Sequence, residues 1–569
     1  MSTGRKKCVF YALLLIIPLI VSNPLSAKKW PVYAQHGMVV STEQIASRVG
    51  MEILKKGGNA VDAAVATGFA LAVVHPAAGN IGGGGFMVIR FADGVTTAVD
   101  YREKAPIAAH EKMFLNEKGN VIRNSNHRGY LAVGVPGTVA GMTLALEKYG
   151  TLSLKEVLKP AIKLAEKGFV VSHAMSQDFS RLFDLFQRYP ASKKVFLKED
   201  GAPYQTGEIF KQKDLAATLK RIAKKGRDGF YKGKTAELIE RDMQRNGGII
   251  TREDLAAYRA VIRKPIEVTY RGYSVFSMPP PSSGGVSLAI MLNILENYDL
   301  AALGHNSAAY IHLVAEAMRR AFAERALHLG DPDFNPKMPV EKLISKEYAR
   351  ELSQSIDMTR ASKSDPDRFN WSYESDETTH YSVVDARGNA VSNTFTLEQW
   401  YGTKIVADGL GFLYNNEMGD FNAWPGHTDS TGLIGTRPNL IQPGKRMLSS
   451  MTPTIVARDN KTLLVTGSPG GRTIINTVLQ TILNVVDFEM NVFEAVDAPR
   501  FHHQWLPDVI RLEKWGFSND SVALLNQMGH QTNWYRTQGR AMAIQIDPET
   551  GFKLGAGDPR SPNRGAVGY

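Results

Sequence analysis

The 569-residue sequence predicts a fold that mixes helices with antiparallel strands. Residues 378–397 predict a hairpin, because strand formers such as Tyr381 and Val383 precede a turn at 386–389 and a second apolar stretch. Segments such as 154–167 and 234–246 predict helices. Strands and helices do not follow a β-α-β rhythm, so the pattern alone leaves α/β and α+β open.

The N-terminal segment has the features of a secretory signal peptide. Basic residues at 5–7 precede an apolar run at 9–21, and small residues follow up to Ala27. We expect cleavage after Ala27, so that residues 1–27 are removed and the mature protein is periplasmic or secreted, with no membrane span. An uncleaved membrane anchor is the alternative.

Composition excludes several kinds of site. The single cysteine, Cys8, lies inside the signal segment, so the mature chain has no disulfide, thiol nucleophile or thiolate metal site. The formal charge is +11, but basic residues are scattered among acidic ones. That distribution favours a solvated surface over nucleic-acid binding.

The first elements after residue 40 are two predicted helices. The first spans 42–56, with Ser41 as its cap, and the second is an Ala-rich helix at 59–74 that suggests close packing against a sheet. Four glycines at 82–85 then precede a strand and indicate that the backbone approaches something closely. A tight helix-to-strand connection is the simpler interpretation, and a dinucleotide loop is excluded because a strand follows.

Later elements follow the same mixed pattern. A strand at 96–101 places Arg102 at its end. The remaining predicted elements are a strand at 270–277, a rigid turn at 278–285 leading into a helix that ends at 295, and helices at 312–327 and 474–486.

The hairpin that begins at Thr378 follows a polar stretch at 362–377, which suits a flexible linker. A threonine that opens a strand after such a linker is what a self-cleaving precursor needs. Its hydroxyl attacks the preceding carbonyl, and water then releases an N-terminal threonine whose α-amine serves as base. An ordinary exposed hairpin is the alternative interpretation.

Four further segments add specificity to the Thr378 hairpin. Together with 378–385, they occur in an order and spacing that closely resemble γ-glutamyltransferase (γ-glutamyltranspeptidase), a family of N-terminal nucleophile hydrolases. These segments are 100–106, 413–421, 446–454 and 466–471. The resemblance covers nearly the whole chain after the first thirty or so residues.

The resemblance implies an α+β fold, a four-layer αββα sandwich that is one co-folded unit. It implies self-cleavage between Glu377 and Thr378, which gives a large subunit at 28–377 and a small subunit at 378–569 that remain together as a heterodimer. Thr378 would be the nucleophile in both cleavage and turnover.

The resemblance also assigns residues around Thr378. Thr396, on the return strand, would orient its hydroxyl. The backbone amides of Gly470 and Gly471 would form the oxyanion hole, which suits their place before a helix. An ordinary strand residue and a simple strand-to-helix turn are the alternatives.

A γ-glutamyl group carries an α-carboxylate and an α-ammonium, and candidate partners exist for both. Arg102 offers a bidentate fork to the carboxylate, and Ser449 and Ser450 add hydroxyl donors. Glu417 and Asp420 can hold the ammonium. Taken one at a time, these residues are more typical of a surface salt bridge for Arg102, a helix cap or turn for the serines, and solvent-exposed side chains for the acids.

Two positions vary within the family. Glu398 stands where many members have Asn, and its carboxylate could strengthen ammonium binding. The segment 425–442 resembles the lid over the substrate, but Thr431 stands where some bacterial members have a tyrosine, so gating by an aromatic residue is in doubt.

The sequence therefore predicts an acyltransferase and hydrolase that passes the γ-glutamyl group of glutathione and related compounds to water, amino acids or peptides. No cofactor or metal is expected. A cephalosporin or glutaryl acylase of the same superfamily is the nearest alternative, and a periplasmic solute-binding protein is one from another class. A metallohydrolase is disfavoured, because neither His110-Glu111 nor the adjacent pair His502-His503 has a suitable ligand spacing.

Overall fold

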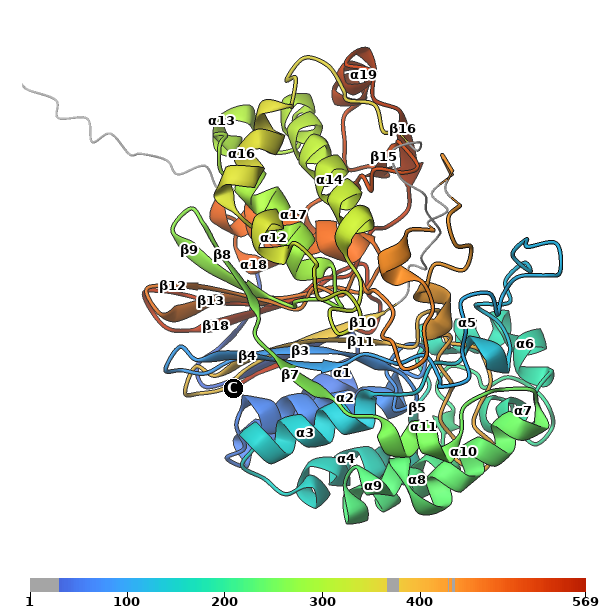
Figure 1. Cartoon of the computed structure of the whole chain (residues 1–569). Helices are drawn as coiled ribbons and strands as arrows, with labels where there is room; N and C mark the ends of the chain where they lie inside the picture. Colours follow the sequence, from blue (N-terminus) through green and yellow to red (C-terminus); the bar gives the residue numbers. More distant parts are fainter. Residues whose placement is uncertain (1–29, 366–377, 428, 432–434) are drawn as a thin grey trace, which may run out of the picture.

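The computed structural model describes residues 30–365, 378–427, 429–431 and 435–569. The predicted signal segment 1–27 and Glu377 lie outside these ranges. Two seven-stranded sheets stack at the centre of the molecule, and helices cover the outer face of each (Figure 1). This is the predicted four-layer αββα sandwich, and its α+β character is confirmed because neighbouring strands in both sheets run antiparallel.

The first sheet carries the Thr378 hairpin at its centre. In spatial order its strands are β19 (Gly565–Gly568), β2 (Met38–Ser41), β10 (Thr379–Val384), β11 (Ala390–Thr396), β3 (Gly84–Arg90), β4 (Thr96–Tyr101) and β7 (Val261–Arg263). Thr379 pairs with Phe395, so Thr378 lies beside Thr396. Strands from before and after Thr378 are interleaved in this sheet, so the two segments fold as one unit.

The second sheet packs face to face with the first. In spatial order its strands are β1 (Val32–Ala34), β18 (Lys553–Gly557), β17 (Met542–Ile546), β13 (Lys461–Thr466), β12 (Thr454–Arg458), β9 (Tyr273–Ser277) and β8 (Ile266–Tyr270). Apolar side chains from both sheets form the core between them, among them Phe86, Val88, Ile455 and Val465.

Helices form the two outer layers (Figure 1). On the side of the first sheet lie α1 (Gln44–Lys55), α2 (Ala60–Val74), α3 (Thr138–Tyr149), α4 (Leu154–Lys167), α5 (His173–Arg181), α6 (Phe183–Gln187), α7 (Pro190–Phe196), α8 (Lys213–Lys225), α9 (Asp228–Tyr231), α10 (Gly233–Arg245) and α11 (Arg252–Ala257). On the side of the second sheet lie α12 (Gly284–Leu295), α13 (Leu300–Leu303), α14 (Ala308–His328), α15 (Val340–Leu343), α16 (Lys346–Gln354), α17 (Thr473–Val486), α18 (Val492–Asp497) and α19 (Asn519–Gln527).

Short elements complete the described chain. They are β5 (Phe169–Val170), β6 (Ile209–Phe210), β14 (Phe501–His502), β15 (Ile510–Glu513), β16 (Thr532–Tyr535), and the 3-10 turns η1 (Tyr130–Ala132), η3 (Glu417–Asp420) and η4 (Arg437–Asn439). Within the described ranges, no helix combines the length and the apolar character that crossing a membrane requires.

The Ala-rich helix α2 packs against the hairpin strands β10 and β11, as the composition predicted. Every one of its residues is buried. Small side chains allow the helix backbone to approach the sheet, and Asn59 caps its first turn by accepting hydrogen bonds from Val61 N and Asp62 N. The helix therefore supports the sheet directly behind the candidate nucleophile.

The glycine run at 82–85 is explained by close backbone approach rather than by a tight connection alone. A Cβ atom on Gly83 would lie 2.0 Å from the carbonyl oxygen of Thr396, and one on Gly82 would lie 2.2 Å from that of Leu413. Both distances are too short for any side chain. The glycines thus let the segment before β3 pack against the strand end that carries Thr396.

Two details of the sequence prediction are wrong. Ser41 does not cap α1: it ends strand β2, and the N-cap is Glu43. The predicted single strand at 270–277 is the end of β8, a turn and β9. The turn is sharp because Arg271 and Gly272 both adopt positive φ angles of 51° and 80°.

Candidate active site

The end of the β10–β11 hairpin brings two threonine hydroxyls together. Thr378 Oγ1 donates to Thr396 Oγ1 over 3.5 Å, and both residues are nearly fully buried. Thr396 is fixed from two sides, since its Oγ1 accepts from Glu398 N at 2.9 Å and its carbonyl accepts from Asn80 Nδ2 at 2.8 Å. The acceptor beside the Thr378 hydroxyl is therefore rigidly placed.

The glycine turn before α17 lies close to this pair of threonines. Gly470 and Gly471 have positive φ angles of 131° and 53°, which favour glycine. Their carbonyls accept from Thr473 N and Ile474 N, so the turn leads directly into the first turn of the helix. The positive end of the helix dipole favours negative charge here. Gly471 shares a pocket with Thr378, whereas Gly470 lines a neighbouring one.

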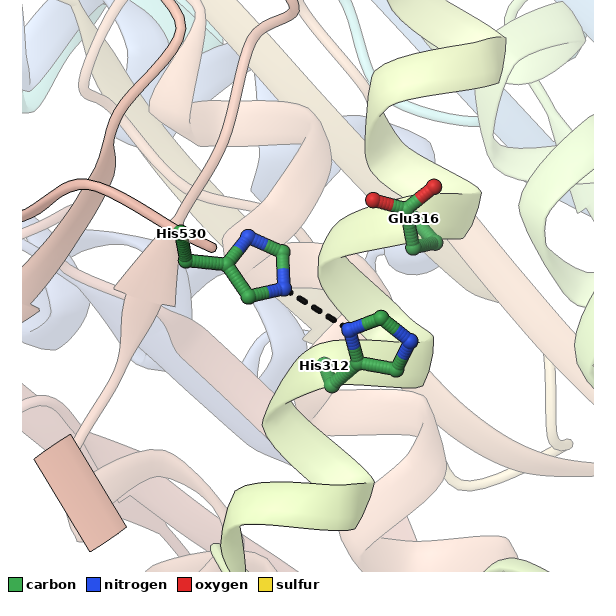
Figure 2. Close-up of side chains that lie close together, drawn as sticks. All are labelled: His312, Glu316 and His530. Atoms are coloured by element: carbon green, nitrogen blue, oxygen red, sulfur yellow. Dashed lines mark hydrogen bonds between the residues drawn. The ribbon is translucent and has the colours of Figure 1, made fainter. Parts of the chain in front are cut away.

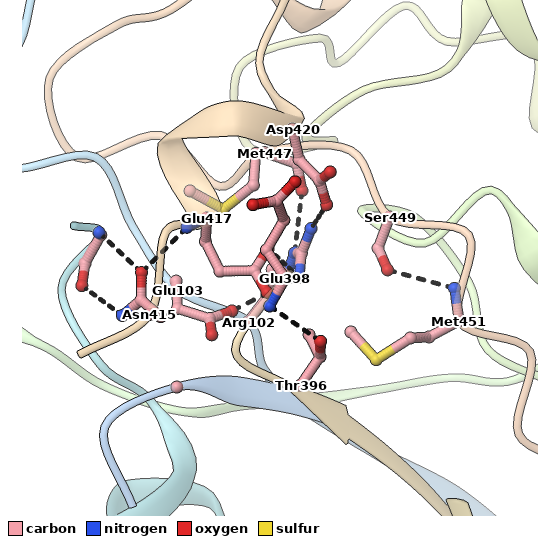
Figure 3. A network of polar contacts seen from close by, with 12 residues as sticks. Arg102, Glu103, Thr396, Glu398, Asn415, Glu417, Asp420, Met447, Ser449 and Met451 are labelled. Atoms are coloured by element: carbon pink, nitrogen blue, oxygen red, sulfur yellow. Dashed lines mark hydrogen bonds and ion pairs between the residues drawn. The ribbon is translucent and has the colours of Figure 1, made fainter. Parts of the chain in front are cut away.

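Arg102 follows strand β4 and is fully buried. Its guanidinium lies 2.6 Å from a Glu417 carboxylate oxygen, forms a short contact with Asp420, and donates from Nε to Met447 O at 3.3 Å (Figure 3). Burial disfavours the arginine charge, but the carboxylates of Glu417 and Asp420 outweigh burial and raise its pKa. Arg102 is therefore a permanent cation in an acidic surrounding.

The acids around Arg102 differ in their access to the pocket. Glu417 and Glu103 are fully buried, and burial raises the pKa of Glu417 well above its usual range and that of Glu103 to about 8. Asp420 keeps 13% of its side chain exposed and lines the pocket with Arg102. Glu417 is not part of the pocket lining, so it contacts Arg102 from the side away from the pocket.

Glu398 lies next to the threonines and faces His127. The residue is nearly fully buried, has a positive φ of 77°, and places Oε1 3.1 Å from His127 Nδ1. Burial opposes the histidine charge, but the Glu398 carboxylate outweighs it and raises the pKa of His127. Among the described residues, Glu398 Oε2 has no hydrogen-bond partner although the atom is buried. It is an acceptor available to a bound ligand.

The serine pair is held by contacts from the second helical layer. Ser449 Oγ accepts from Met451 N at 3.1 Å (Figure 3), and its carbonyl accepts from Ser283 Oγ at 2.6 Å. Arg325, on α14, donates to Ser283 Oγ at 2.8 Å and to Ser450 Oγ at 3.1 Å. These contacts fix the backbone of the serine pair at the pocket wall.

One pocket collects most of the residues that the sequence singled out. Among the described residues, its lining omits only Glu417 and Gly470 of the predicted set. The lining residues are Arg102, Thr378, Thr396, Glu398, Asp420, Ser449, Ser450, Met451, Gly471 and Ile474. A candidate nucleophile, a cation, two carboxylates and hydroxyl groups therefore share one small pocket.

The segment 425–442 is tied to the pocket at one end. Asn439 Nδ2 donates to Asp420 O at 2.7 Å, and Gly426 N donates to Gly435 O at 3.0 Å. Thr431 is exposed and bonds to Asp429. Residues 428 and 432–434 lie outside the described ranges, so the role of this segment as a lid stays a prediction.

A separate cluster of metal-ligand types lies on α14, where His312 and Glu316 meet His530 (Figure 2). His312 Nδ1 lies 2.8 Å from His530 Nε2, and its Nε2 lies 2.8 Å from Asp357 O. Glu316 forms ion pairs with Arg319 and Arg320 at 3.1 and 2.6 Å. Both ring nitrogens of His312 have hydrogen-bond partners, and two guanidiniums repel a cation, so the arrangement is typical of a structural network.

Three contributors to the site were missed from the sequence. Glu103 follows Arg102 directly, so adjacency could have indicated it. Arg325 lies inside a helix, and His127 lies in a loop without a recognisable motif. Only the folded chain brings these last two to Ser450 and Glu398.

Comparisons with known proteins agree with this geometry. Residues 46–568 match the family described as gamma-glutamyltranspeptidase. The "Glutathione hydrolase proenzyme" of Escherichia coli (strain K12) is 51% identical over 542 residues, covering 95% of this chain and 93% of that protein. The "Acylase ACY 1 proenzyme" of Pseudomonas sp. (strain V22) is 41% identical over 545 residues, 94% of each chain. The crystal structure of a cephalosporin acylase from Bacillus halodurans superposes with a TM-score of 0.82 at 26% identity, covering 98% of this chain and 99% of that one. The chain therefore belongs to the gamma-glutamyltranspeptidase family.

Proposed function

We propose that the chain is a self-processing γ-glutamyltransferase and glutathione hydrolase that uses Thr378 as its nucleophile. The observation that carries this proposal is the composition of the Thr378 pocket. It combines a hydroxyl nucleophile with a buried arginine, two carboxylates and two serines. Those groups complement the carboxylate, the ammonium and the distal carbonyl of a γ-glutamyl substrate.

Maturation begins at the bond between Glu377 and Thr378. The Thr378 hydroxyl attacks the Glu377 carbonyl, the amide becomes an ester, and water hydrolyses the ester. The products are segments 28–377 and 378–569, after export has removed the leader 1–27 in the periplasm or outside the cell. They stay together as a heterodimer, because β10 of the second segment pairs with β2 of the first.

Turnover then uses the new α-amine of Thr378 as the base. The amine takes the hydroxyl proton, Oγ1 attacks the γ-carbonyl, and the backbone amides of Gly471 and Gly470 stabilise the oxyanion. The departing amine takes up the proton and leaves a γ-glutamyl ester on Thr378. Water, an amino acid or a peptide then accepts the γ-glutamyl group. The steps use no metal or cofactor.

Substrate binding replaces an ion pair within the protein by ion pairs between the protein and the substrate. Arg102 pairs with Asp420 in the structure. The substrate carboxylate takes a place at Arg102, with Ser449 or Ser450 donating, while its ammonium takes Asp420 and the unpartnered oxygen of Glu398. Glu417 stays behind Arg102 and keeps the guanidinium oriented.

The acylase alternative shares the nucleophile and the glycine turn but does not need the acids. A glutaryl group is a γ-glutamyl group without its ammonium, so it would leave the carboxylates at Asp420 and Glu398 without a cation. Unpaired buried charge is costly, and sites built for a polar partner reject analogues that lack it.

The test compares kcat/KM for γ-glutamyl and glutaryl anilides at neutral pH. Because Asp420 is partly open to water, we expect a preference of about 10²-fold or more for the γ-glutamyl compound. Asp420→Asn should sharply reduce this preference. Equal kcat/KM values of the wild type for the two anilides would contradict the proposed transferase function and support an acylase.

A further inference from the structure

A second pocket opens beside Thr378. Thr378 lines it together with Asp178, Arg181, Trp400 and Arg540. The lining residues of the two pockets have only Thr378 in common within the described chain. Its volume is about 280 Å³, against about 20 Å³ for the pocket that contains Arg102. The nucleophile therefore faces a narrow site for the acyl group and a wider site for something else.

The wide pocket is built from rigid polar and aromatic groups. Trp400 Nε1 donates to Asp178 at 2.9 Å, and Asp178 forms an ion pair with Arg181 at 2.9 Å. The ring of His75 packs edge-on against Trp400, with centroids 5.5 Å apart. Burial and the Arg540 charge lower the pKa of His75 to about 4, so this ring adds no charge at neutral pH.

Among the residues that the structure describes, the charged ones that line this pocket are two arginines, Arg181 and Arg540, and one acid, Asp178, whose carboxylate acts on both guanidiniums. The Arg540 guanidinium lies 5.4 Å from the centroid of the Trp400 ring, which fixes its position by a cation–π contact. Within the described ranges, its side chain has no ion pair and no hydrogen bond. Arg181, in contrast, is already paired with Asp178. Arg540 also lines the neighbouring pocket that contains Gly470, so it borders both pockets.

We propose that the wide pocket binds the amine partners of the reaction, and that Arg540 selects amines that carry a free carboxylate, as amino acids and dipeptides do. The inference rests on the proposed function, since it needs a γ-glutamyl ester on Thr378. The Arg102 pocket is filled by the γ-glutamyl group at that stage, which leaves the wide pocket as the approach to the ester. A planar guanidinium held over an indole ring is suited to a carboxylate.

The transfer step is balanced without any further reactant. The acceptor enters as a neutral amine, and its nitrogen forms a bond to the γ-carbonyl carbon. The ester bond to Thr378 Oγ1 breaks, and the amine proton passes through the α-amine to that oxygen. The products are a new amide and the free Thr378 hydroxyl. The amine that the donor releases during acylation occupies the same pocket before it leaves.

The experiment measures transfer from a γ-glutamyl anilide to glycylglycine and to glycylglycinamide, using the full mature enzyme at one pH. Each kcat/KM is normalised to hydrolysis by the same preparation. A charge-assisted contact at a half-exposed site predicts that the wild type prefers the free carboxylate by about tenfold. Arg540→Gln should reduce that ratio to about twofold or less, and Arg540→Lys should keep most of it.

Arg536→Gln is the matched control, because this arginine is exposed, lies in the same loop and lines neither pocket. It should keep the wild-type ratio. Equal use of the two acceptors by the wild type, or an unchanged ratio in Arg540→Gln, overturns the inference. If Arg540→Gln does not mature, the preference of the wild type for glycylglycine over glycylglycinamide still tests the inference. An enzyme that fails to hydrolyse the donor at all would instead contradict the proposed function itself.

Discussion

The Oγ1 atoms of Thr378 and Thr396 lie 3.5 Å apart where strand β10 begins and strand β11 ends in the first sheet. Thr396 is held by Glu398 N and by Asn80, and Gly83 packs against its carbonyl with no room for a side chain. The fold thus places one fixed hydroxyl beside the candidate nucleophile. This relationship predicts that Thr396 serves to orient Thr378.

Thr396→Val should slow both self-cleavage and turnover. The substitution keeps the shape of the side chain but removes the oxygen that accepts the Thr378 proton. Poor orientation of a reacting group can cost about 10²-fold in rate. We expect the rate constant for acylation by a γ-glutamyl anilide, measured in a single turnover, to fall by about 10- to 100-fold. Thr396→Ser, which keeps the hydroxyl, should stay within a few-fold of the wild type. Wild-type kinetics in Thr396→Val would show that this hydroxyl has no orienting role.

Arg102→Ala should impair catalysis far more than processing. Loss of a charged, bidentate contact to the substrate carboxylate costs about 2–4 kcal/mol in transition-state binding, or roughly a thirty- to thousand-fold fall in kcat/KM. Self-cleavage should be nearly normal, because it involves no α-carboxylate. Arg102→Lys keeps the charge without the fork and should recover only part of the activity. Unchanged kcat/KM in Arg102→Ala for a γ-glutamyl anilide would refute the assignment.

The ion pair between His127 and Glu398 should make stability depend on pH. The folded pKa of His127 is raised above its ordinary value of 6.5, with Asp420 adding to the effect of Glu398 and Lys404 opposing it. The pair therefore stabilises the protein fully below pH 6.5, and the effect is lost as the pH rises through the folded pKa.

The measurement is the difference in Tm between the wild type and His127→Gln at about pH 6 and about pH 9. The Tm of the wild type should exceed that of His127→Gln by more at the lower pH. In a Glu398→Gln background, the same substitution of His127 should show little pH dependence. A difference in Tm that is equal at both pH values would mean that the ion pair contributes nothing.

Local chemistry explains which parts of the fold could be predicted. The Ala-rich helix 59–74, the glycine run at 82–85 and the Thr378 hairpin each carry a pattern set by packing or by turn geometry. The structure has each of them nearly where the sequence predicts. The prediction that Ser41 caps α1 is wrong, although a serine before a helical pattern is typical of a cap. Only the pairing of β2 with β10 shows that Ser41 belongs to a strand.

The candidate site was predictable as a set of residue types but not as an arrangement. The motifs at 100–106 and 413–421 name Arg102, Glu417 and Asp420 but cannot say which acid lies behind the arginine. That depends on how η3 folds over the end of β4. His127 carries no local signal, since its contact with Glu398 joins a loop to a strand end far along the chain.

Denaturing electrophoresis of purified wild type and Thr378→Ala, with N-terminal sequencing of each band, tests the central claim most directly. The wild type should give two fragments, and the smaller should begin Thr-Thr-His-Tyr, the sequence that starts at Thr378. Thr378→Ala lacks the attacking hydroxyl and should remain one uncut chain. A Thr378→Ala protein that still splits at this bond in the absence of protease would contradict the account.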